Sequence, residues 1–116
     1  MEDSILNSIK SMLPMDSSMT EFDIPIKIAI NTAFFNLYQM GIGPSEDSFS
    51  ITGDKETWTD FMIVPYIDSI KTYIYIITRI QFDPPQSSLL LDALKASANE
   101  QEFRLMIESQ KEGGSQ

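Results

Sequence analysis

The segment at residues 66–82 constrains the fold more than any other, because it runs for seventeen residues without glycine or proline. Its many isoleucines fit one stripe of a helix, and they fit one face of a β-strand equally well. Length favours the helix, since ordinary strands span about 3–10 residues and a helix of this size is about 25 Å long. Two prolines follow Asp83 and end the segment. After Asp68 its only charges are Lys71 and Arg79, so we predict a helix that serves packing and assembly and not catalysis.

Four further segments have apolar residues at helical spacing. Asp3 or Ser4 can cap the first of them and Pro14 ends it, while Asp23 and Pro25 form a good start for the second. The second has Lys27 as its only charge within residues 24–40, so we expect it to be the most buried helix. The four expected helices are residues 5–13, 24–40, 57–63 and 88–110, the last capped by Ser87 or Ser88.

The last of these helices has seven apolar residues that we assign to one face. They are Leu89, Leu90, Ala93, Leu94, Phe103, Met106 and Ile107. Beyond it, residues 113–116 are expected to form a flexible tail. At 116 residues the chain has the size of one domain, and we place that domain at residues 1–112.

A long connection at residues 41–56 separates the second helix from the third. It contains three glycines and Pro44, and its residues 49–52 alternate in polarity, which predicts a short β segment. Sixteen residues is longer than most connections in compact domains, so we expect this one to be functional or mobile.

Composition excludes several kinds of chemistry. The chain has no histidine and no cysteine, which removes the usual proton shuttle, the thiolate nucleophile, soft metal ligands and disulfides. It also has no stretch of about 18–20 apolar residues, and its acidic start lacks the basic region of a signal peptide. We therefore expect a soluble protein made in a cytoplasm, with no cofactor and no membrane partner. An enzyme is the least favoured class.

The net charge of −9 is concentrated in the middle of the chain, where residues 41–68 carry six acidic residues and one basic residue. This charge would repel nucleic acid and anionic membranes. The acids do not have the spacing of a calcium loop, so a solvated acidic loop is favoured over a metal site. The acidic residues considered are Glu46, Asp47, Asp54, Glu56 and Asp60.

Three aromatic residues have two readings each. Tyr73 and Tyr75 could stack on bases, but their place in an apolar helix favours a role in the core and its rim. Trp58 is expected to close the long connection over the core, and the alternative is an anchor between subunits.

Four strings in order resemble small head-tail connector, or adaptor, proteins of tailed bacteriophages. They are INTAFFNLYQMGIGP (residues 30–44), FSITG (49–53), TWTDF (57–61) and IKTYIYIITRIQFDPPQSS (70–88), within a similarity covering residues 24–107. The resemblance implies a mainly α fold, a small helical bundle of four to five helices with a long loop carrying a short β segment. It also implies a structural virion protein of the neck, assembled in the host cytoplasm, with no active site.

The same resemblance implies the partners. Copies of the chain would form a ring, commonly of about twelve subunits, between the portal protein and the next neck or tail-completion protein, and genomic DNA would pass through without specific binding. Residues 41–58 would contact neighbouring subunits or the next ring, and the last helix would dock against the portal. The expected interface residues are Gly41, Gly43, Pro44, Phe49, Ile51, Trp58, Phe103, Met106 and Ile107. The connection at residues 62–65 and the short polar tail depart from the family pattern.

Acidic residues have a physical use in such a conduit, because they would lower its affinity for phosphates and let DNA slide. The expected channel-lining residues are Glu46, Asp47, Glu56 and Asp60. An alternative function is an acidic binding protein that mimics DNA and occupies a basic site on a host or phage protein. Binding by a mimic would weaken strongly as ionic strength rises, whereas an apolar ring interface would not.

Overall fold

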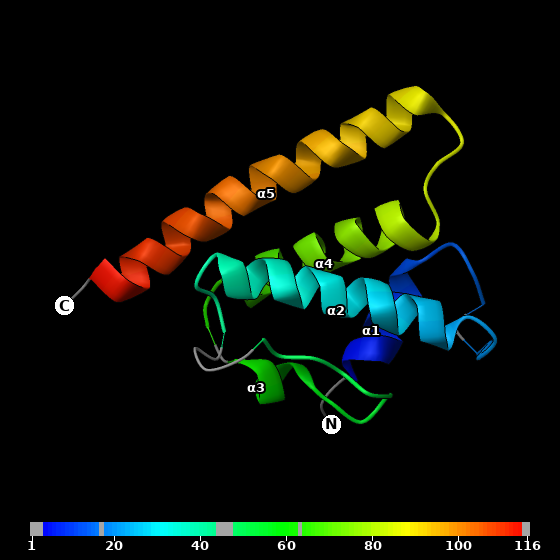
Figure 1. Ribbon diagram of the computed structural model, residues 1–116, viewed down its shortest axis with the longest axis horizontal. Helices are drawn as coiled ribbons and strands as arrows, with labels where there is room; N and C mark the ends of the chain where they lie inside the picture. The colour runs from blue at the N-terminus through cyan, green and yellow to red at the C-terminus, as the bar shows by residue number, and fades with distance from the viewer. Residues whose placement is uncertain (1–3, 17, 44–47, 63, 115–116) are drawn as a thin grey trace.

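A computed structural model describes residues 4–16, 18–43, 48–62 and 64–114 of the chain. These residues form a small helical bundle (Figure 1), which confirms the predicted mainly α fold. The helices are α1 (Ile5–Met12), α2 (Asp23–Gln39), α3 (Trp58–Phe61), α4 (Ile67–Phe82) and α5 (Ser88–Gly114). The ambiguous segment is therefore a helix, as its length predicted. Among the described helices, none is both long enough and apolar enough to cross a membrane.

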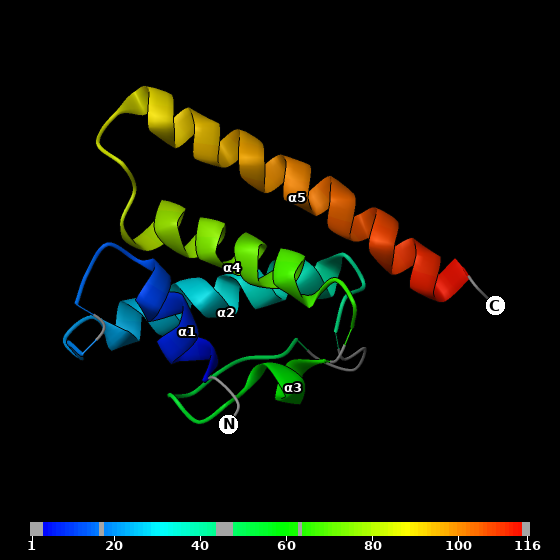
Figure 2. The same ribbon diagram turned by 180° about the vertical axis from the view of Figure 1, so that it is seen from behind.

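The centre of the bundle is α4, which packs against α2 and against α5. Ile70, Tyr73 and Ile74 recur at helical spacing along its buried side. Figures 1 and 2 show α5 along one side of α4, with α1 and α3 on the other side of the bundle. Short α1 contacts both α2 and α4, which gives it the support that an eight-residue helix needs. Its predicted cap is present, since the Ser4 hydroxyl accepts a hydrogen bond from the Asn7 amide at 3.2 Å.

The predicted β segment at residues 49–52 is wrong, since the described residues there have no strand. A side chain takes the place of a partner strand. The Asn31 amide group, on α2, accepts a hydrogen bond from the Ile51 backbone N–H at 2.7 Å and donates one to the Ile51 carbonyl at 3.0 Å. Because these bonds satisfy the backbone of Ile51, it needs no β ladder. The only β contact among the described residues is an isolated bridge between Ser4 and Thr57.

The sequence assigned seven apolar residues of α5 to one face, and the structure buries none of them. The two buried residues among its described side chains are Ala98 and Leu105. The exposed large apolar residues of α5 are Leu89, Leu90, Phe103, Met106 and Ile107. α5 therefore contacts the bundle through a narrow strip and leaves a second apolar surface uncovered. The helix continues to Gly114, so residues 113 and 114 of the expected tail are helical, and residues 115–116 lie outside the described residues.

A buried ion pair joins the first two helices. The Lys10 side chain is 3% exposed, and its Nζ donates hydrogen bonds to the Asp23 carboxylate at 2.7 Å and to the Met19 carbonyl at 2.6 Å. Asp23 lies in the first turn of α2, where a negative charge also favours the helix dipole. The pair therefore fixes the turn that leads from α1 into α2.

Candidate assembly surfaces

The connection between α2 and α3 is held in place by its own polar groups. The Glu56 carboxylate accepts hydrogen bonds from the Thr52 backbone N–H at 3.0 Å and from the Thr52 hydroxyl at 2.9 Å. The Glu56 carbonyl accepts a hydrogen bond from the Ile5 N–H at 2.9 Å, which ties the connection to α1. Burial raises the pKa of Glu56, but the hydrogen bonds from Thr52 and from the backbone of Glu56 and Gly53 together outweigh it and hold the pKa below its usual value. The ionised Glu56 side chain therefore stabilises the connection within the subunit.

The other expected channel residues divide into two groups. The Asp60 carboxylate accepts a hydrogen bond from the Thr57 N–H at 2.9 Å, which caps α3. Its side chain remains exposed. Glu46 and Asp47 lie outside the described residues. Among the described residues, no three acidic side chains gather closely enough to hold a metal ion.

Aromatic rings fix the same connection from the inside. The ring of Phe49 lies 5.0 Å from the ring of Phe34 on α2 and 5.4 Å from that of Phe61 on α3, measured between ring centres. Ile51 is buried beside Asn31. Gly43 has a φ of +100°, and a Cβ at this position would lie 2.7 Å from the Phe61 ring. Of the expected interface residues in this connection, Gly41 is exposed, Phe49 and Gly43 are half-buried, and Pro44 lies outside the described residues.

Trp58 lies in the interior of its own subunit. Its side chain belongs to the main core, and its indole N–H donates a hydrogen bond to the Ser8 hydroxyl on α1 at 3.0 Å. The Lys71 ammonium lies 5.3 Å from the centre of the ring, within the range of a cation–π interaction. Trp58 therefore closes the connection over the core.

Tyr73 joins three helices at the centre of the bundle. Its hydroxyl donates a hydrogen bond to the Glu102 carboxylate on α5 at 2.8 Å and accepts one from the Asn36 side chain on α2 at 3.1 Å. Burial raises the pKa of Tyr73 well above its usual value, so the hydroxyl keeps its proton and remains a donor. Tyr73 is thus a core residue that holds α5 in register with α2 and α4. Tyr75 is half-buried, at the rim.

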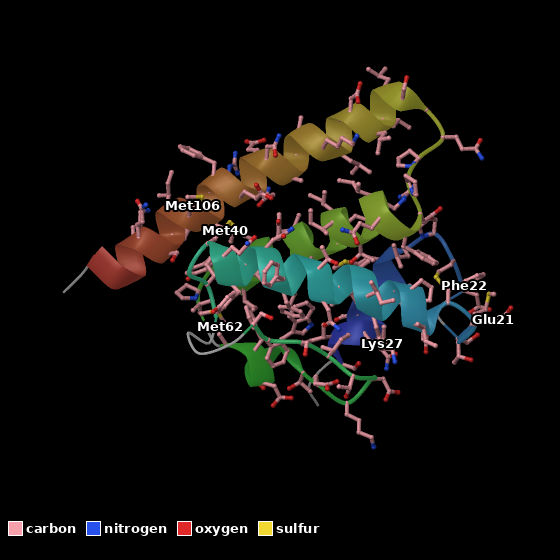
Figure 3. All side chains as sticks on the ribbon, in the orientation of Figure 1. Glu21, Phe22, Lys27, Met40, Met62 and Met106 are labelled. Carbon is pink, nitrogen blue, oxygen red and sulfur yellow. The ribbon has the colours of Figure 1, made fainter. Side chains whose placement is uncertain are left out.

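The C-terminal half of α5 carries the most prominent apolar surface among the expected interface residues. We call Phe103, Met106 and Ile107 the α5 patch. Phe103 is 66% exposed and the other two side chains are about 40% exposed, and Figure 3 places Met106 on this half of the helix. A groove of about 460 Å³ adjoins the patch between Ile107 and the two residues before α4, Pro65 and Tyr66, and it is also lined by Arg104 and Glu108. The α5 patch is therefore a candidate surface for a protein contact.

Sequence reasoning missed one surface completely, the outer face of α2. Ile24, Ile28 and Phe35 are exposed there. The apolar character of the helix predicted burial, but it is apolar nearly all round its axis, which is also the pattern of a helix that meets partners on two sides.

Comparison with known proteins identifies the family. No curated protein and no solved structure matches the chain. A family model described as phage connector protein matches residues 5–112, which include all the helices described above except the last two residues of α5. The chain therefore belongs to the phage connector protein family, whose members are structural proteins of the phage neck.

Proposed function

We propose that this chain forms a ring between the portal protein and the next neck or tail-completion protein, and that genomic DNA passes through the ring. The observation that carries the proposal is the α5 patch, an apolar surface exposed on a chain with a net charge of −9. Copies of so acidic a chain repel one another at long range, so stable assembly needs uncharged contact surfaces. The proposed ring has about twelve subunits, related by a closed rotation.

We assign the α5 patch to the portal contact. When a partner covers a large apolar side chain that is otherwise in water, burial of that side chain contributes about 1.5–3 kcal/mol to the free energy of binding. α5 suits this role because its buried strip, at Ala98 and Leu105, leaves the patch free. The portal would therefore bind the helix without any rearrangement of the core.

Replacing Phe103 with lysine should weaken binding to the portal ring by about tenfold or more, since it removes one apolar anchor. The measurement is portal binding by sedimentation, with negative-stain imaging of the bound and free protein. Rings on the portal are expected for the unchanged chain. Asn99→Lys, at another exposed position of α5, serves as the control and should bind normally. Full-strength binding by Phe103→Lys would show that the α5 patch does not contact the portal. If the unchanged protein were absent from purified particles, the ring proposal would be wrong.

The acidic connection is proposed to face the DNA. Glu56 and Asp60 are hydrogen-bonded within the subunit, so a reversal of their charge would also disturb the fold. The test therefore uses the other two expected channel residues, Glu46 and Asp47. We expect Glu46→Lys with Asp47→Lys to slow DNA ejection from particles, because the two lysines would bind phosphates.

A matched control for the ejection experiment is Glu21→Lys with Asp92→Lys, which reverses the same number of charges at two exposed positions outside the connection. Ejection at the unchanged rate in both double variants would contradict the proposal that this connection faces DNA. The alternative of a DNA mimic has no specific observation in its favour, because Glu56 in the connection and Asp60 on α3 both bond to the subunit's own backbone.

A further inference from the structure

The outer face of α2 has no charged residue. Its exposed positions are Ile24, Pro25, Ile28, Phe35 and Gln39. The two charged residues of α2 are half-buried and have partners elsewhere, since Asp23 pairs with Lys10 and the Lys27 Nζ donates a hydrogen bond to the Thr52 carbonyl at 3.0 Å. Ile24 and Ile28 are each more than 60% exposed. Surface helices of soluble proteins ordinarily present charged residues to water. This chain has 25 charged residues, so the absence of any from this face is unusual. The face is therefore built for contact with protein.

A second uncovered apolar surface lies between the end of α4 and the first half of α5. A groove of about 390 Å³ opens there, lined by Arg79, Pro85, Leu90, Ala93, Leu94 and Ser97. Leu89, at the start of the same helix, is 77% exposed. The Arg79 Nε donates a hydrogen bond to the Asp83 carbonyl at 2.6 Å and lies near the Asp83 carboxylate. The positive charge of Arg79 is therefore neutralised by Asp83 within the subunit. We call this surface the α4–α5 groove.

We infer that the outer face of α2 in one subunit packs into the α4–α5 groove of the next subunit in the ring. The inference rests on the proposed function, and it names the partner of each surface. Bulky Ile24, Ile28 and Phe35 project from α2, and Ala93 leaves room in the groove for a side chain to enter between its neighbours. Since both surfaces are apolar and carry no unpaired charge, two copies can meet there despite their overall repulsion.

The two surfaces belong to different elements, so the contact is heterologous. α2 and α5 pack on α4 as separate partners (Figures 1 and 2). A two-fold dimer that paired both surfaces reciprocally would stop at two subunits, whereas a head-to-tail contact continues until a ring closes. This difference makes the inference testable.

The absence of native cysteine allows a direct test. Particles are prepared with Ile28→Cys, with Ala93→Cys, or with both changes in one chain, and are treated with a short bismaleimide. The double variant should give a ladder of covalent multimers, because every subunit then has a thiol on each surface. The single variants should stay monomeric on a denaturing gel. A mixture of the two single variants should stop at dimers. Phe35→Cys with Leu89→Cys provides a second pair if the first is not incorporated into particles.

Asn7→Cys combined with Ala93→Cys is the matched control, since Asn7 is exposed on α1, and it should give no ladder. Covalent dimers from Ile28→Cys alone would overturn the inference in favour of a two-fold α2 contact. Particles that contain several copies of either test pair and give no cross-link, or dimers alone, would also overturn it and leave the proposed function standing. Absence of the chain from particles would instead contradict the proposed function itself.

Discussion

Replacing Asp23 with alanine is expected to lower the free energy of unfolding by about 3–5 kcal/mol. The change leaves the Lys10 ammonium inside the protein with the Met19 carbonyl as its remaining partner. At 3% exposure, that ammonium cannot recover its hydration without local opening. The change also removes a negative charge from the first turn of α2. Urea or thermal unfolding followed by circular dichroism measures the loss.

Replacing Lys10 in place of Asp23 should lower the free energy of unfolding by a smaller amount. In Lys10→Met the remaining Asp23 carboxylate is 26% exposed and can bind water, while methionine fills the buried space. We expect a loss of about 1–2 kcal/mol. The double variant should recover much of the loss seen in Asp23→Ala, because it leaves no unpaired buried charge. Equal losses in the two single variants, or full additivity in the double variant, would contradict the buried pair.

The second large effect is expected at Gly43, where alanine should destabilise the protein by about 2–4 kcal/mol. The backbone there has a φ of +100°, a conformation that side chains disfavour, and the added Cβ would lie 2.7 Å from the Phe61 ring. Phe61 is buried and packs against both Phe34 and Phe49. The ring therefore has little room to move. Chemical unfolding again provides the measurement.

Gly41 offers a matched control two residues away. Its φ is +83°, but a Cβ there would have no neighbour within 4 Å. Gly41→Ala should therefore show the conformational cost alone, about 1 kcal/mol. If the two alanine variants were equally stable, the contact between residue 43 and Phe61 would not contribute, and the connection would not be fixed by its aromatic rings.

Sequence patterns predicted the helices well because the strongest signals are local. The length of residues 66–82 and the prolines after Asp83 were enough to define α4, and Ser4 caps α1 as expected. The prediction of a β segment was wrong because the residue that decides the structure there is distant in the sequence. The backbone of Ile51 finds its partner in a side chain twenty residues away, on α2.

The candidate surfaces were predictable only in part. Phe103, Met106 and Ile107 are indeed exposed, but periodicity could not say which apolar residues of α5 face the core, since both sides of the helix carry them. Trp58 and Ile51 were expected at an interface, and their side chains lie inside the subunit. Burial of Lys10 was also invisible, because a lysine in a short amphipathic helix is ordinarily solvated and its partner lies thirteen residues away.

The position of Trp58 gives the protein its own optical reporter. It is the sole tryptophan in the sequence, and its indole bridges α3 to Ser8 on α1 beneath the connection that leads there from α2. An indole held in this dry setting emits at shorter wavelength than one in water, and the nearby Lys71 ammonium adds a second influence on the emission. Intrinsic fluorescence of the isolated chain therefore reports on this one junction, without any attached dye.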